Sequence, residues 1–231
     1  MIFLKRNKES GTNLKLKTLI LIISALLPSA AALGKESSDT ISARRAFIEM
    51  PETVLDLISA DMRLDMLDHY DADSVGKGIN TLRGEAAITQ LTPDFINVDL
   101  TGVSTLQYKI FRQKNGSDVL LSIYTVGEKD GERDSEIIFY DSNLSPLKTD
   151  KFIKKPQLSD FFDLKGYKTK MKEIEELIPF YNISYEANPG SNEVRAKLSF
   201  GDAMPLEDLK LIEMFLKPEI IYTWNGKELK R

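Results

Sequence analysis

The chain has 231 residues, with 31 lysines and arginines, 35 aspartates and glutamates, a single histidine and no cysteine. This length is enough for one or two conventional domains, and the lack of cysteine excludes disulfides, thiol catalysis and thiolate zinc sites. The sequence also contains no Gly-x-Ser-x-Gly elbow and no phosphate-binding glycine loop, so it carries no signature of those hydrolases or nucleotide-binding proteins.

The first 33 residues have the order of a secretory signal peptide. A leader with five lysines and arginines precedes the uncharged apolar run Thr18–Leu33, which ends in small residues. The run has 16 residues, fewer than the roughly 20 that a membrane-spanning helix needs, and Pro28 interrupts it. We therefore expect cleavage near Ala32, export to the periplasm or the outside of the cell, and no integral membrane segment afterwards. The alternative is a retained membrane anchor.

The charge of the mature chain excludes one class of partner. Removal of residues 1–33 leaves 26 lysines and arginines against 34 aspartates and glutamates, a formal charge of −8. An acidic protein of this kind should repel nucleic acid and anionic lipid headgroups, and we expect no nucleic-acid partner. The polar residues 34–43 are expected to be a flexible mature terminus.

Residues 44–150 are predicted to form a first α+β unit. Apolar residues at near-helical spacing indicate one or two helices across residues 51–70, with Pro51 at a first helical position. Between residues 79 and 141, polar and apolar residues alternate in short segments separated by turn residues. These segments predict four or five antiparallel strands, because the connections are too short for parallel crossovers.

Residues 151–231 are predicted to form a second α+β unit with the same order. Helical patterns at residues 158–178 precede two alternating strands around an Asn-Pro-Gly turn. A short helix and a final hairpin at Asn225-Gly226 follow. The predicted fold class is therefore α+β, with two tandem helix-plus-antiparallel-sheet units. The alternative is a chance likeness between two α+β halves.

The stretch "LDHYDADSVGKG" at residues 67–78 is the part of the chain that most resembles a metal site. A calcium loop that starts at Asp71 would use Asp73 as a ligand, but Val75 and Leu82 occupy positions where oxygen ligands are needed. We interpret the stretch as the end of a helix followed by a turn, with His69 at the negative end of the helix dipole. No metal site or cofactor is predicted, although weak calcium binding at Asp71 and Asp73 stays open.

Aromatic residues on the strands are the candidate partner-binding residues. Tyr222 and Trp224 have the i, i+2 spacing that places both on one face of a strand, either in the core or as a platform for a sugar ring or a peptide. Tyr108 and Tyr140 are the other two candidates. No catalytic residue is predicted, because carboxylate pairs such as Asp160 with Asp163 are expected by chance in an acidic chain.

Four stretches carry a resemblance to a known family. They are "ARRAFIEMPETVLDLISADMRLDMLDHYDAD", "LTPDFINVDLT", "DSEIIFYDSNLSPL" and the closing "LKPEIIYTWNGKEL". Together they resemble an uncharacterised family of exported Bacteroidetes proteins known only as a domain of unknown function, over roughly residues 43–230. The resemblance implies export and a small α+β body, and it implies no site residues. The layout is also similar, at the level of fold alone, to tandem-repeat β-lactamase-inhibitor-like proteins.

These observations favour an exported, non-catalytic α+β binding protein of the bacterial cell envelope, with a protein or an envelope glycan as its partner. A sheet covered by helices on one side leaves the other face free for such a partner. The alternative is a carboxylate-dependent envelope hydrolase, assisted by calcium at Asp71 and Asp73. A third hypothesis is an assembly or scaffold subunit.

Overall fold

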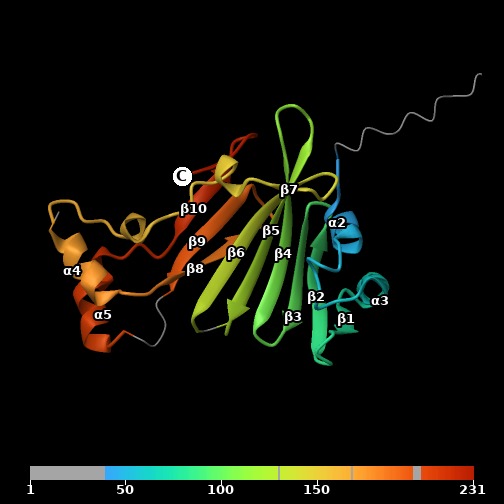
Figure 1. The fold of residues 1–231 in the computed structure, drawn as a ribbon, viewed down its shortest axis with the longest axis horizontal. Coiled ribbons are helices and arrows are strands. Elements are labelled where there is room, and N and C mark those ends of the chain that lie inside the picture. The colour runs from blue at the N-terminus through green and yellow to red at the C-terminus, as the bar shows by residue number, and fades with distance from the viewer. Residues whose placement is uncertain (1–39, 130, 168, 200–203) are drawn as a thin grey trace, which may run out of the picture. The chain divides into compact units, whose positions relative to one another are not determined.

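The structure is a computed structural model, and it describes residues 40–129, 131–167, 169–199 and 204–231. The predicted signal peptide and most of the predicted flexible terminus lie outside the described residues. Residues from Ser38 to Arg231 form one compact unit, which Figure 1 shows as a mixture of helices and two sheets. The α+β prediction is confirmed. No helix in the described ranges has the length and apolar character needed to cross a lipid bilayer.

The larger sheet is an antiparallel meander in which strands that follow each other in the chain are neighbours in the sheet. The central strands β4 and β5 are buried on both faces, because the sheet is covered by helices on one side and by the smaller sheet on the other. The seven strands are β1 (Gly76–Ile79), β2 (Glu85–Thr92), β3 (Phe95–Thr101), β4 (Ser104–Arg112), β5 (Asp118–Gly127), β6 (Arg133–Asp141) and β7 (Pro146–Leu147).

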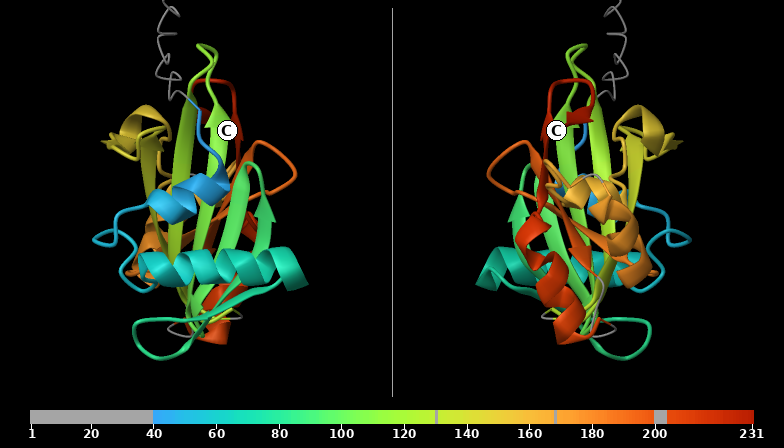
Figure 2. Two further views of the ribbon diagram at one scale, coloured as in Figure 1. Left: turned by 90° about the vertical axis from the view of Figure 1, so that its right-hand side faces the viewer. Right: turned by 90° about the vertical axis from the view of Figure 1, so that its left-hand side faces the viewer.

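Two helices, α2 (Ala43–Glu49) and α3 (Ala60–Asp73), pack on one face of this sheet (Figure 2, left). Each begins at a serine whose hydroxyl accepts a backbone N–H of the first turn. Of the one or two helices predicted across residues 51–70, α3 forms and a helix from Pro51 does not, because residues 51–59 are irregular turns and the cap at Ser59 starts α3 at Ala60.

The smaller sheet has four antiparallel strands in the order β11-β10-β9-β8. Its strands are β8 (Asn182–Ala187), β9 (Glu193–Ser199), β10 (Ile220–Trp224) and β11 (Leu229–Lys230). The helices of this half are α4 (Lys170–Leu177), α5 (Leu206–Ile212) and the 3-10 turns η1 (Thr149–Lys151), η2 (Leu158–Phe161) and η4 (Glu213–Phe215). Of the helical patterns predicted at residues 158–178, the first forms only the 3-10 turn η2 and the second forms α4.

The apolar interior consists of two clusters on opposite faces of the larger sheet. The helix-side cluster holds α2 and α3 against β2, β3 and β4. The second cluster lies between the two sheets and includes side chains from α4 and α5. Because the inter-sheet cluster contains residues from both halves of the chain, neither half buries its apolar face alone.

Candidate functional site

A groove opens on the helix-covered face of the larger sheet, over the half that α2 and α3 leave uncovered. The main contacts of the two helices are with β1 to β4, and the irregular segment 51–59 borders the cavity over β5 and β6. The resulting cavity, here called the helix-side groove, has a volume of about 270 Å³. It is lined by Val54, Leu55, Asp56, Leu57, Leu100, Leu106, Tyr108, Ser122, Tyr124, Glu136, Ile138 and Tyr140.

Cross-strand pairing explains why aromatic and apolar side chains meet in this groove. Leu106 is paired with Tyr124, and Tyr124 is paired with Glu136 on the next strand. One step along the same face, Tyr108, Ser122 and Ile138 form a second row. Residues directly opposite each other on neighbouring strands point to the same face of a sheet. Alternate residues of β4, β5 and β6 therefore point to one side of the sheet and together form the wall of the groove.

Three hydroxyl groups at the base of the groove have no hydrogen bond to any residue that the structure describes. They belong to Tyr108, Ser122 and Tyr140, whose exposed fractions are 1%, 8% and 3%. Burial raises the pKa of both tyrosines, and the negative charge of Glu136 further raises that of Tyr140. Both phenols are therefore neutral donors at pH 7. These hydroxyl oxygens are not among the fully buried polar atoms that lack a partner, so they stay accessible from the groove and can bond water or a ligand there.

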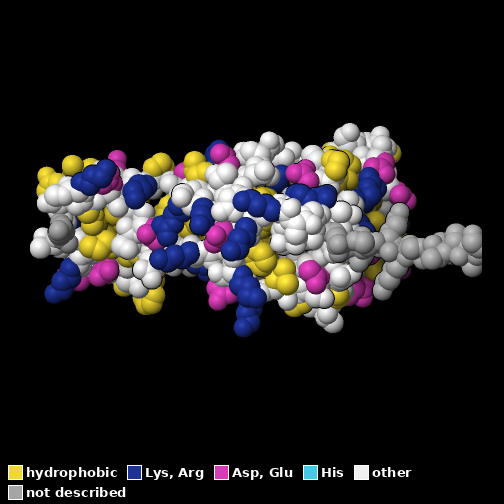
Figure 3. Space-filling model, turned by 90° about the horizontal axis from the view of Figure 1, so that it is seen from above, with side chains coloured by type: hydrophobic (Ala, Val, Ile, Leu, Met, Phe, Trp, Pro, Cys, Tyr) yellow, Lys and Arg dark blue, Asp and Glu magenta, His cyan; other side chains and the backbone are white. Residues whose placement is uncertain are grey.

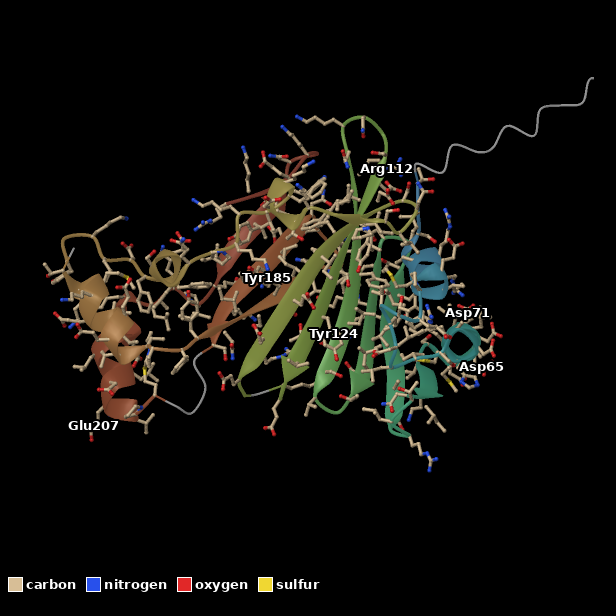
Figure 4. The ribbon with its side chains drawn as sticks, in the orientation of Figure 1. Asp65, Asp71, Arg112, Tyr124, Tyr185 and Glu207 are labelled. Carbon is tan, nitrogen blue, oxygen red and sulfur yellow. The ribbon has the colours of Figure 1, made fainter. Side chains whose placement is uncertain are left out.

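The charged groups that line the groove are all acidic. Asp56 and Glu136 are exposed at its border, and neither carboxylate has an ion pair among the described residues. No lysine or arginine is among the described lining residues. Figure 4 marks Tyr124, which is partly exposed, on the strand β5. The groove thus combines an apolar and aromatic wall with negative charge.

The four tyrosine and tryptophan residues predicted as partner-binding residues fall into two different places. Tyr108 and Tyr140 line the helix-side groove. Tyr222 and Trp224, with exposed fractions of 1% and 6%, lie in the core between the two sheets. Trp224 stacks on Phe111 at 4.9 Å between ring centroids, so the second pair occupies core positions and not a surface platform.

A second cavity, here called the polar cleft, lies on the opposite face of the larger sheet beside β8 and has a volume of about 360 Å³. Its amide side chains bond one another, because Gln107 donates to Asn97 (3.1 Å) and Asn97 donates to Thr89 (2.6 Å). The cleft is lined by Thr89, Asn97, Asp99, Thr105, Gln107, Thr125, Lys129, Arg133, Tyr185 and Glu186. Tyr185 is marked in Figure 4. Most amide and hydroxyl groups of this cleft satisfy each other, whereas the buried Nε of Arg133 has no hydrogen-bond partner among the described residues.

The carboxylates of the polar cleft also have basic partners. Asp99 lies 3.5 Å from the ammonium of Lys129, and Glu186 lies 3.5 Å from that of Lys197. Outside this cleft, Asp160 was considered above as a carboxylate pair with Asp163. The carboxylate of Asp160 accepts from Arg231 at 2.8 Å. That bond lowers the pKa of Asp160 against an opposing effect of burial. Such ion pairs favour the charged form of the acid and not the protonated form that a general acid requires.

The stretch at residues 67–78 contains the end of α3, as its sequence indicates, and after two residues the strand β1 begins where only a turn was expected. Nδ1 of His69 lies 2.9 Å from the carbonyl oxygen of Lys77, which can only accept, so Nδ1 carries the proton. The side chain of Asp71 forms a forked ion pair with Arg44. A Cβ atom on Gly76 would lie 2.2 Å from the carbonyl oxygen of Met66, so glycine lets α3 approach β1 closely. Among the described residues, no cluster of three metal-ligating side chains exists.

We expect His69→Ala to lower the free energy of unfolding by about 1 kcal/mol, because it removes one exposed hydrogen bond to the outer edge of β1. Urea unfolding followed by circular dichroism measures this change. Asp68→Ala, an exposed neighbour on the same helix, should change stability by less than about 0.5 kcal/mol. A rise in the thermal midpoint of the wild type on addition of calcium would contradict the purely structural role of this stretch.

Comparisons with known proteins give a family but no activity. The family model described as "Protein of unknown function (DUF3256)" matches residues 36–229. The chain belongs to the DUF3256 family. This membership confirms the predicted relation to a family of unknown function. No curated protein matches significantly.

Solved structures similar to this DUF3256 chain include a domain from Porphyromonas gingivalis W83. It is titled "Structure of a domain of an uncharacterized protein from Porphyromonas gingivalis W83", and its source belongs to the Bacteroidetes. It is 23% identical, with a TM-score of 0.66, and the match covers 81% of this chain and 96% of that one. At this identity the likeness establishes the fold alone.

Proposed function

We propose that this chain is an exported, non-catalytic binding protein of the bacterial cell envelope, and that the helix-side groove holds a segment of a partner protein. In this proposal an apolar side chain of the partner enters the groove, and a neighbouring lysine or arginine meets Asp56 and Glu136. The observation that carries the proposal is the pair of hydroxyls on Tyr108 and Tyr140, which have no hydrogen bond to a described residue and face a cavity with an acidic border.

The chemistry of the groove favours a peptide over a polar small molecule. Its volume of about 270 Å³ accommodates one or two side chains but is small for a cofactor. Backbone carbonyls of an extended peptide would accept from the tyrosine hydroxyls. The partly exposed ring of Tyr124 offers a face to a cationic group, and the two carboxylates add an opposite charge.

Two finer proposals about the architecture are consistent with this function. We propose that the chain arose from two helix-plus-antiparallel-sheet units, α3 with the meander and α4 with β8 and β9. The insertion of α5 between β9 and β10 is the main departure from that repeat. The proposed likeness to tandem-repeat β-lactamase-inhibitor-like proteins is an analogy of fold, and it favours a surface that docks on another protein.

The groove is tested with two hexapeptide amides, one alternating leucine and lysine and one alternating leucine and glutamate. We expect the chain from residue 34 onward to bind the lysine peptide at least about tenfold more tightly, because the glutamate peptide meets only like charge. Tyr124→Ala should weaken binding of the lysine peptide about tenfold and Glu136→Gln about fivefold. Isothermal titration calorimetry measures both effects.

The matched control is Tyr181→Ala combined with Glu207→Gln. Tyr181 is 39% exposed, and Glu207 lies on α5, far from Tyr124 (Figure 4). This variant should bind the lysine peptide as the wild type does. Equal affinity for the two peptides, or an equal loss in the groove and control variants, would rule out the helix-side groove as the site.

The second candidate function is the carboxylate-dependent envelope hydrolase, and one observation favours it. The polar cleft contains Asp99 and Glu186, which come from different sheets and line the same cavity. A glycosidase requires two carboxyl groups on either side of the scissile bond. Release of soluble sugars from purified cell wall that disappears in Asp99→Asn and in Glu186→Gln would replace the binding proposal with this one.

A further inference from the structure

Three segments distant in sequence form one end of the described unit. They are the β4–β5 connection at residues 113–117, the segment 148–155 that includes η1, and the β10–β11 hairpin. The backbone N–H of Lys114 donates to the carbonyl oxygen of Gly226 (2.9 Å), and that of Leu229 donates to Phe152 (2.7 Å). The hydroxyl of Tyr222 donates to the carbonyl oxygen of Lys154 (3.0 Å). These bonds fix the three segments beside one another.

This end carries a surplus of exposed lysines, which are gathered in dark blue over the middle of Figure 3. Three of its basic residues are neutralised, because Arg112 pairs with Asp118, Lys230 with Glu228 and Arg231 with Asp160. The remaining lysines are all exposed and have no ion pair among the described residues, and Asp150 is the one nearby acid in the segment 148–155. They are Lys114, Lys148, Lys151, Lys154, Lys155 and Lys227.

The surplus is local, since the mature chain as a whole is acidic. Much of the negative charge lies elsewhere, for example on α3, where five aspartates occur within 14 residues. Figure 4 marks two of them, Asp65 and Asp71, on α3 and away from Arg112 at the end of β4. Net charge therefore does not describe how this end interacts. A basic patch on an acidic protein orients that protein toward a negatively charged surface.

We propose that the basic end docks on the anionic phospholipid headgroups of a bilayer. Its six unpaired lysines are spread over three segments, and they line neither the helix-side groove nor the polar cleft. Lysine ammonium groups on flexible stems suit a diffuse layer of headgroup charge, whereas a single bound phosphate is held by a converging set of donors. A cluster of four to eight basic residues is the size that holds proteins at anionic bilayers.

The entry point of the chain favours a membrane over another anionic partner. The backbone N–H of Ile41 donates to the carboxylate of Asp118 (2.8 Å), which is also paired with Arg112, so the described chain begins at this basic end. In the sequence, the apolar run Thr18–Leu33 ends seven positions before Thr40. A run of this kind meets a membrane during export. In the order of the sequence, the basic end is therefore the first part of the folded unit after that run.

The proposal is tested by co-sedimentation with vesicles of phosphatidylcholine alone or mixed with phosphatidylglycerol. The protein is the chain from residue 34 onward, which contains the whole compact unit Ser38–Arg231. We expect partitioning into the phosphatidylglycerol vesicles only, and its loss at high salt, where headgroup charge is screened. Substitution of Lys151, Lys154 and Lys155 by glutamine should weaken partitioning about a hundredfold, at about fivefold for each lysine.

The control variant replaces three other exposed lysines, Lys165, Lys172 and Lys210, which lie in and beside α4 and α5. It should sediment with phosphatidylglycerol vesicles as the wild type does, and circular dichroism should show the same fold for all three proteins. Equal partitioning into both kinds of vesicle, or equal losses in the two variants, would overturn the proposal. Retention on immobilised heparin without sedimentation on any vesicle would overturn it in favour of an acidic polysaccharide.

Discussion

We expect Trp224→Ala to lower the free energy of unfolding by about 4 kcal/mol, close to the upper range for removal of a large buried side chain. The indole stacks on Phe111 (4.9 Å) and Phe152 (6.3 Å), and its Nε1 donates to the carbonyl oxygen of Arg112 at 2.8 Å. Phe111 and Arg112 belong to the larger sheet and Trp224 to the smaller one. The substitution therefore opens a cavity where the two sheets are joined.

Urea unfolding followed by circular dichroism measures this loss, because Trp224 is the single tryptophan and its replacement removes the fluorescence signal. Trp224→Phe should cost only about 1–2 kcal/mol, since it keeps the stacking and loses the bond to Arg112. Ile221→Ala is the matched control on the same strand, because Ile221 is 43% exposed on the opposite face. A loss for Trp224→Ala no greater than that of the control would contradict a joining role.

The position of Trp224 also changes how binding experiments are designed. A Trp224→Ala variant that fails to capture a partner would report the damaged core and not a lost contact. Tyr222 has the same limitation, because its ring is 1% exposed and its hydroxyl is bonded to the backbone of Lys154. Tyr124 and Glu136 are better probes of binding, since both are accessible and neither belongs to either fully buried cluster.

The strands were predictable from the sequence because their signals are local. Alternation over residues 95–111 and the Asn225-Gly226 turn depend only on neighbouring residues, and β3, β4 and the final hairpin form as predicted. The apolar pattern does not show whether a helix starts at Pro51, because the start of a helix depends on which residues cap its N-terminus. Ser59 and the side chain of Glu52, which accepts from Ala60 N at 2.7 Å, fix the start of α3 nine residues later.

The groove could not be located from the sequence, although two of its residues were predicted as partner-binding residues. Tyr108 and Tyr222 have the same apolar and aromatic strand surroundings, and periodicity assigns each to one face of a strand without saying what covers that face. The distinction arises because α2 and α3 make their main contacts with β1 to β4, which leaves a groove open on this face over β5 and β6. Tyr124 and Glu136 gave no separate signal, since partly exposed residues on a strand are common.

We expect Arg63→Ala to lower the free energy of unfolding by about 3 kcal/mol, because it leaves several buried acceptors without a donor. Arg63 lies on α3 with 1% of its surface exposed, and burial lowers the pKa of its guanidinium without discharging it. Its Nη1 donates to the carbonyl oxygens of Phe47 (3.0 Å), Ile48 (3.2 Å) and Met50. These carbonyls belong to the end of α2, where the helix leaves acceptors unpaired and carries partial negative charge.

The same side chain links the stability of the helices to the helix-side groove. Arg63 lies close enough to Tyr108 to influence its ionisation, and Tyr108 forms part of the base of the groove. Arg63→Lys should recover part of the stability, because an ammonium supplies donors but not the guanidinium fork. Arg45→Ala on α2, whose exposed side chain pairs with Glu49, is the control and should cost less than about 0.5 kcal/mol. If Arg63→Ala unfolds at the same urea concentration as Arg45→Ala, the carbonyls of α2 are satisfied in another way, and the stability of the two helices does not depend on this arginine.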